Sequence, residues 1–151
     1  MAETGLRWHV PVILGAFVAF ISALLTNRWM DGGGFPPRVP WLTIILLLAI
    51  GVLVLRFGAA VRAYQAGRRA DLSPIRAART LALAQAATLT GAAVGGFFLG
   101  QLLAVLPDRD MQVVQGLVWR FALAILAAAG VAVCGMVAQH WCRIPPKDPE
   151  E

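Results

Sequence analysis

The chain alternates four long apolar runs with short polar segments. The runs comprise Val10–Thr26, Trp41–Phe57, Leu81–Leu106 and Val113–Cys142. Each contains a stretch of about 17–25 residues, the length that a helix needs to cross the hydrocarbon of a bilayer. The second run is uncharged from Trp41 to Leu55 and apolar on every face, which is typical of a helix that faces lipid or is deeply buried.

This pattern predicts an all-α fold, an integral membrane four-helix bundle formed by a single domain over residues 1–151. We expect membrane spans at about residues 10–28, 41–63, 80–106 and 113–141, followed by an irregular tail over 143–151. Ser73 and Pro74 predict that the third helix begins before the membrane, and Pro107 predicts its end. Cleavage of the first span as a signal peptide stays an alternative, although only Arg7 supplies a basic n-region beside Glu3.

Tryptophan and tyrosine mark the ends of the predicted spans. Their rings prefer the headgroup zone of a bilayer, because one edge is polar and the body is apolar. Three pairs lie 21–23 residues apart, about 32–35 Å along a helix: Trp8 and Trp29, Trp41 and Tyr64, and Trp119 and Trp141. This separation matches the thickness of a bilayer and supports the membrane interpretation.

The positive charge predicts the orientation. The chain has 14% charged residues and a net charge of +5, whereas a soluble domain has about 25% charged residues. Six arginines between Arg56 and Arg79 are accompanied by one acid, Asp71, so the positive-inside rule places a basic loop, residues 64–79, and both termini in the cytoplasm. We therefore expect a multi-pass protein of the inner (plasma) membrane.

Because the charge lies between apolar runs, the expected partners are anionic lipids on the cytoplasmic side and not nucleic acid. The candidate contacts with headgroups or a partner are Arg62, Arg68, Arg69, Arg76 and Arg79.

Small residues four positions apart allow close helix packing in a membrane. The third span has two such pairs, and the fourth span has a complementary set of small residues. The candidate packing residues are Gly91, Gly95, Gly96 and Gly100 on the third span, and Ala128, Gly130 and Ala132 on the fourth. They predict packing inside one bundle, a surface for a second copy or another membrane protein, or one pair for each purpose.

Uncharged polar residues inside the spans provide a candidate polar path. Its residues are Gln85, Thr88, Gln101 and Gln115, and hydrogen bonding to a neighbouring helix is the alternative role for each of them. Proton-coupled chemistry normally requires Asp, Glu or His at mid-depth, and the spans contain none there. His140, Cys142 and His9 are too few and too dispersed for zinc. We therefore expect no enzymatic activity, no catalytic residue, no metal site and no cofactor.

Three segments resemble a known family of membrane proteins. They are PPRVPWL (Pro36–Leu42), RAARTLALAQAATLTGAAVGG (Arg76–Gly96) and CRIPP (Cys142–Pro146), and in this order they resemble the actinobacterial family catalogued as domain of unknown function 3180. The resemblance implies a four-helix inner-membrane protein whose activity is unassigned. Relatives are encoded near folate-pathway genes, which implies a link to pterin or cofactor metabolism. Relatives often carry lysine where this chain has Gln85, so a function that depends on a cation there is not implied.

Two functional hypotheses follow. The first is a non-enzymatic assembly, scaffold or accessory subunit that packs through its glycine-rich third helix with a second copy or another membrane protein. The alternative is a component of a transporter or exporter for a small solute, such as a pterin-like molecule or an amphiphile, with the polar residues of the spans lining its path.

Overall fold

Four long helices make up the computed structural model, which describes residues 7–35, 37–67, 73–108, 110 and 112–142. They are α1 (His9–Asp31), α2 (Trp41–Gln65), α3 (Pro74–Val105) and α4 (Gln112–Cys142), and a short 3₁₀ turn, η1 (Leu106–Asp108), follows α3. Within these residues there is no strand. All four helices are long and apolar enough to cross a membrane, which confirms the all-α, four-span prediction.

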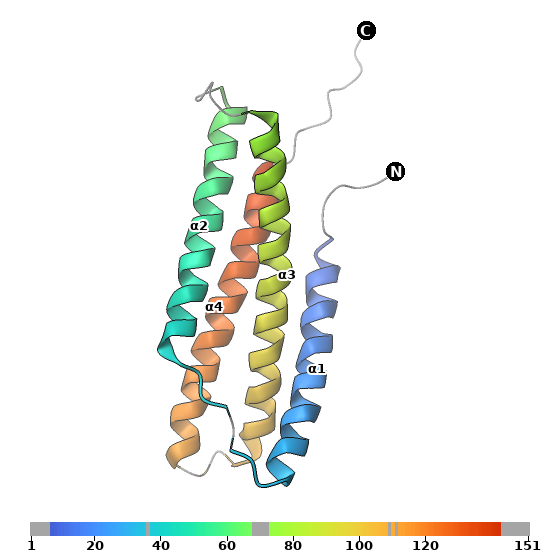
Figure 1. Cartoon of the computed structure of the whole chain (residues 1–151), viewed down its shortest axis with the longest axis vertical. Helices are drawn as coiled ribbons and strands as arrows, with labels where there is room; N and C mark the ends of the chain where they lie inside the picture. Colours follow the sequence, from blue (N-terminus) through green and yellow to red (C-terminus); the bar gives the residue numbers. More distant parts are fainter. Residues whose placement is uncertain (1–6, 36, 68–72, 109, 111, 143–151) are drawn as a thin grey trace.

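The helices alternate in direction, and α3 and α4 form the centre of the bundle (Figure 1). α1 packs on α3, α2 packs on α4, and α2 contacts α3 less extensively. The end of α4 and the connection between α2 and α3 lie at one end, the upper end in Figure 1, and α1 begins some way below it. We call this the basic end, because Arg62, Arg76 and Arg79 lie there.

The first connection crosses the opposite end of the bundle from α1 to α2 (Figure 1). Gly33 has a φ of 82° just beyond α1, a left-handed conformation that glycine adopts without steric cost. Val39, two residues before α2, is buried and belongs to the main apolar cluster. The connection is therefore anchored to the core, which holds α2 against α4.

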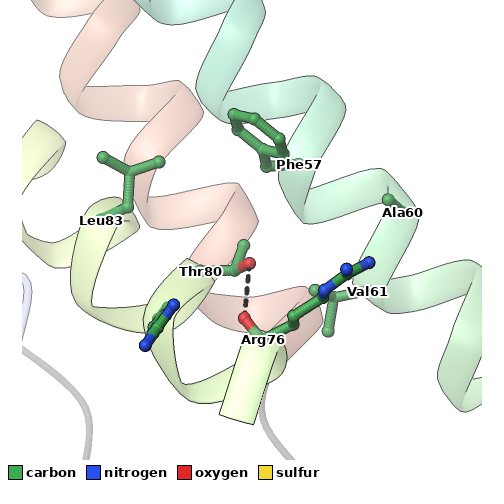
Figure 2. A pocket seen from close by; sticks show the side chains of 7 residues that line it. Phe57, Ala60, Val61, Arg76, Thr80 and Leu83 are labelled. Carbon is green, nitrogen blue, oxygen red and sulfur yellow. Dashed lines mark hydrogen bonds between the residues drawn. The ribbon is translucent and has the colours of Figure 1, made fainter. Parts of the chain in front are cut away.

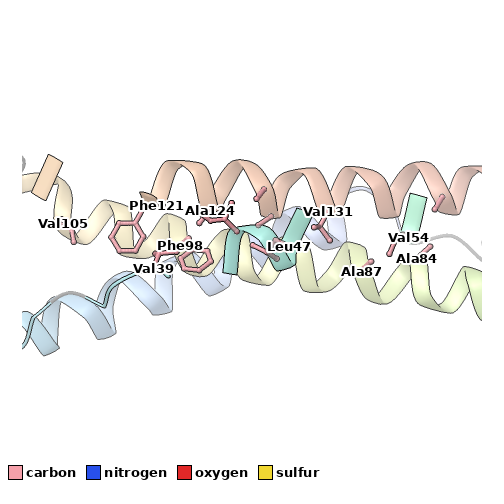
Figure 3. Packing of buried hydrophobic residues seen from close by; sticks show 14 residues of the cluster. Val39, Leu47, Val54, Ala84, Ala87, Phe98, Val105, Phe121, Ala124 and Val131 are labelled. Carbon is pink, nitrogen blue, oxygen red and sulfur yellow. The ribbon is translucent and has the colours of Figure 1, made fainter. Parts of the chain in front are cut away.

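The core is built mostly from small and medium side chains (Figure 3). Phe121 of α4 is fully buried, and its ring centroid lies 6.4 Å from that of Phe98 of α3. Large apolar side chains are instead exposed on the outside, among them Ile13, Phe20, Leu42 and Leu126. This distribution suits a bilayer, where burial of large side chains between helices gains little over contact with lipid and close packing of small residues gains more.

The ends of the third helix agree with the proline positions. Ser73 occupies the N-cap position with extended backbone and Pro74 is the first helical residue, although the Ser73 side chain makes no capping hydrogen bond. α3 ends at Val105, immediately before the 3₁₀ turn that contains Pro107. The basic loop predicted over 64–79 is therefore shorter, because residues 64–65 end α2 and residues 74–79 form the first turns of α3. The predicted tail over 143–151 lies outside the described residues.

Candidate functional site

The second glycine pair of α3 packs on α1. A Cβ atom added at Gly96 would collide with the carbonyl oxygen of Gly15, and its distance to the Gly15 Cα would be 3.0 Å. A Cβ added at Gly100 would collide with the carbonyl oxygen of Ala19 and approach the Ser22 Cβ to 2.7 Å. The backbones of α1 and α3 are therefore in direct contact, and only glycine fits at these two positions.

The first glycine pair of α3 packs on α4. A Cβ at Gly91 would lie 2.7 Å from the backbone nitrogen of Ala132 and 2.9 Å from the carbonyl oxygen of Ala128. Gly95 is less constrained, since its nearest atom would be the Ala128 Cβ at 3.5 Å. About one turn beyond Ala132, Gly135 of α4 approaches the backbone of α3 equally closely. The two glycine pairs of α3 thus serve two different neighbours in the same chain.

One predicted packing residue, Gly130, lies elsewhere. It is exposed on the outer face of α4, and no described atom of another helix lies within 4 Å of its Cβ position. Gly130 follows Ala128 by two residues, which is about 200° around a helix, so both cannot contact α3. The prediction that Gly130 contributes to packing on the third helix is therefore wrong within this chain.

Thr88 hydrogen-bonds across the α3–α4 interface to Gln139. The Gln139 amide nitrogen donates to Thr88 Oγ1 at 2.8 Å and to the Ala84 carbonyl oxygen at 3.4 Å. The Thr88 hydroxyl in turn donates to the same carbonyl oxygen at 2.9 Å. Thr88 and Gln139 are both buried, so this cluster satisfies polar groups that lipid could not satisfy.

Gln101 belongs to a separate cluster at the α1–α3 interface. Its amide nitrogen donates to Ser22 Oγ at 3.3 Å, and the Ser22 hydroxyl donates to the Phe97 carbonyl oxygen at 3.1 Å. The Gln101 Oε1 atom is buried and accepts no hydrogen bond from the described residues. Ser22 and Gln139, the partners in these two clusters, are not among the residues of the candidate polar path. Their pairing has no local sequence signature.

The four residues of the candidate polar path do not line one passage. Thr88 and Gln101 are separated by about 20 Å along α3 and belong to different interfaces. Gln85 is half-buried on α3, and Gln115 is exposed near the start of α4. The hydrogen bonds to neighbouring helices, which were the alternative role, are observed for Thr88 and Gln101.

Two of the candidate arginines line a groove at the basic end. The groove lies between α2 and α3, has a volume of about 380 Å³, and is lined by Phe57, Ala60, Val61, Arg76, Arg79, Thr80 and Leu83 (Figure 2). The Arg76 side chain extends from α3 toward Ala60 and Val61 of α2 (Figure 2). Arg62 is placed differently: its guanidinium carbon lies 5.2 Å from the ring centroid of Trp141 of α4. Arg68 and Arg69 lie outside the described residues.

The apolar part of this groove was not predicted from the sequence. Arg76, Thr80 and Leu83 follow each other at helical spacing, which places them on one face of α3. That spacing indicates a face of α3 that changes from basic to apolar with depth. The opposite wall of the groove, on α2, belongs to an all-apolar run, so the sequence alone does not show which of its residues face α3.

Among the described residues, no group of three His, Cys, Asp or Glu side chains is positioned to hold a metal ion. The chain matches the sequence model of a family described as "Protein of unknown function (DUF3180)" over residues 12–146. No curated protein and no solved structure matches the chain.

Proposed function

This chain belongs to the DUF3180 family of proteins of unknown function, and we propose that it is a non-enzymatic accessory or scaffold subunit of the plasma membrane. In this proposal the basic end faces the cytoplasm and binds an acidic protein partner. The membrane-embedded part holds that docking surface at the bilayer and contacts other membrane components through its outer faces.

The observation that carries the proposal is the contrast between the interior and the basic end. In the part of the chain that the structure describes, the buried polar side chains are Ser22, Thr26, Thr88, Gln101 and Gln139, and all are neutral. Every described Asp, Glu, His, Lys or Arg side chain is exposed or half-buried. An interior that is used for helix packing leaves the surface as the part available for function, and the basic end is its most strongly charged region.

The glycine faces of α3 bear on how such a subunit would assemble. Because Gly91, Gly96 and Gly100 contact other helices of the same chain, a second copy or a partner would have to bind elsewhere. The outer face of α4 has open space at Gly116 and Gly130. We therefore move the proposed membrane contact from the third helix to this face of α4.

The transport hypothesis has less support. A transporter needs polar groups along a continuous route between the two sides of the membrane. Here Thr88 and Gln101 bind to different neighbouring helices at different depths. The small-solute transporter therefore stays the alternative, and it would require a passage formed between copies of the chain.

The assembly role can be tested by cross-linking in native membranes followed by purification. We compare the wild-type chain with the Arg68→Glu/Arg69→Glu variant, which reverses two charges between α2 and α3. The matched control is Arg28→Glu/Arg38→Glu, which reverses two charges at the other end. We expect one acidic protein to be recovered in near-equimolar amount with the wild type and the control, and to be lost with the first variant. Recovery of no protein in near-equimolar amount with the wild type would contradict the proposal.

A further inference from the structure

The lining of the groove between α2 and α3 changes from basic to apolar with depth. Arg76 and Arg79 line its outer part, nearest the end of the helix, and Leu83 lines its deeper part. Arg76 and Leu83 are about 10 Å apart along α3. On α2, Val61 is almost completely buried and forms the floor, and the half-exposed Phe57 lies one turn deeper. The groove is therefore basic at its mouth and apolar below.

The level of the groove can be placed relative to the aromatic ring of Trp141. Ala84 accepts a hydrogen bond from Gln139, which precedes Trp141 by two residues. Thr80 lies one turn from Ala84 toward the basic end, and so lies near the level of Trp141. Tryptophan rings prefer the headgroup zone. The two guanidiniums are therefore at headgroup level or just beyond it, and Phe57 and Leu83 are on the hydrocarbon side.

The charges of Arg76 and Arg79 are not neutralised within the described part of the chain. Both side chains are exposed, and neither has a carboxylate partner there. Among the described lining residues, the only other polar side chain is that of Thr80, whose hydroxyl already donates to the Arg76 carbonyl oxygen at 2.9 Å. Arg76 and Arg79 lie about one turn apart on α3, and guanidinium N–H donors are well suited to phosphate oxygens.

We propose that this groove is a binding site for one anionic phospholipid. The phosphate lies between the Arg76 and Arg79 guanidiniums, and the first part of one acyl chain runs over Val61 between Phe57 and Leu83. Charge complementarity selects an anionic headgroup, and the apolar lower walls select a molecule with an attached chain over a free phosphate. The site does not depend on the protein partner of the proposed function.

The test uses the purified full chain in detergent, titrated with phosphatidylglycerol or phosphatidylcholine, and counts bound lipids by native mass spectrometry. We expect one phosphatidylglycerol to bind at least about fivefold more tightly than phosphatidylcholine. Arg76→Gln and Arg79→Gln should each weaken phosphatidylglycerol binding about fivefold. The control Arg56→Gln removes a charge from α2 outside the groove, and should leave binding unchanged.

A second pair of variants tests the apolar part of the groove without changing charge. Ala60→Phe fills the groove and should abolish the bound lipid, whereas Ala59→Phe places the same ring one residue away, on the exposed side of α2, and should retain it. Three outcomes would each overturn the proposal. The two phospholipids could bind equally, Arg56→Gln and Arg79→Gln could weaken phosphatidylglycerol binding equally, or Ala60→Phe could retain the bound lipid. Glycerol 3-phosphate that competes as well as phosphatidylglycerol would overturn it too, since the site would then bind phosphate alone.

Discussion

Arg62 of α2 lies over the indole ring of Trp141 of α4, with 5.2 Å between the guanidinium carbon and the ring centroid. At the opposite end of the same two helices the roles are exchanged, and the guanidinium carbon of Arg120 of α4 lies 5.7 Å from the ring centroid of Trp41 of α2. α2 and α4 run in the same direction (Figure 1). Two cation–π contacts at opposite ends therefore fix the position of α2 relative to α4 along the bundle axis.

The Arg62–Trp141 contact predicts a measurable coupling between the two side chains. In a double-mutant cycle with Arg62→Gln and Trp141→Leu, we expect a coupling free energy of about 0.5–1 kcal/mol, the value typical of exposed cation–π pairs. The measurement is reversible unfolding by SDS in mixed micelles. The same cycle with Arg120→Gln and Trp41→Leu provides a comparison at the other end. Additive effects in both cycles would show that these contacts do not stabilise the α2–α4 packing.

The glycine contact between α1 and α3 predicts strong sensitivity to a single methyl group. Gly96→Ala places a Cβ against the backbone of Gly15, and neither backbone can move without separating the helices. We expect the free energy of unfolding to fall by about 1–3 kcal/mol.

The matched control for this change is Gly130→Ala, which adds the same methyl group in open space on α4. We expect no loss of stability, and a gain of up to about 1 kcal/mol, because alanine is the better helix former. Both variants are measured by SDS unfolding, and protease sensitivity of α1 reports its detachment. Equal stability of the two variants would contradict direct backbone contact between α1 and α3.

The buried hydrogen bonds of Gln139 predict a moderate loss on its replacement. Gln139→Leu removes the donor to Thr88 Oγ1 and to the Ala84 carbonyl oxygen. Interhelical hydrogen bonds in membranes contribute about 0.6 kcal/mol on average and at most about 1.7 kcal/mol, and we expect a loss within this range. Gln115→Leu, an exposed position on the same helix, should change the unfolding free energy by less than about 0.5 kcal/mol. A larger effect of Gln115→Leu would indicate that Gln115 has a partner outside this chain.

The positive-inside rule predicts which end of the bundle is cytoplasmic. In a background with Cys134→Ala and Cys142→Ala, the Asp31→Cys and Ser73→Cys variants place one thiol at each end, both at exposed positions. With a membrane-impermeant maleimide, we expect labelling of Asp31→Cys in intact cells and of Ser73→Cys only after permeabilisation. The opposite result would place the basic end outside and reverse the orientation of the docking surface.

Local sequence determined much of the architecture. The four apolar runs gave helices at the expected places, Pro74 began α3, and Pro107 followed its end. These features are predictable because the transfer of a helix into lipid depends on its own side chains, and because proline restricts its own backbone and that of its neighbours. The small residues of α3 also indicated close helix packing before any partner was known.

Only the tertiary structure decided which helix each face contacts. The sequence allowed Gly91 and Gly96 to serve one bundle or a second copy, and the structure assigns them to α4 and α1. It paired Thr88 with Gln139, and it opened a groove beside Arg76 where α2 and α3 are less closely packed. The physical reason is that these helices are apolar on nearly every face. Hydropathy then fixes their depth in the bilayer but not their rotation, which depends on how all four helices fit together.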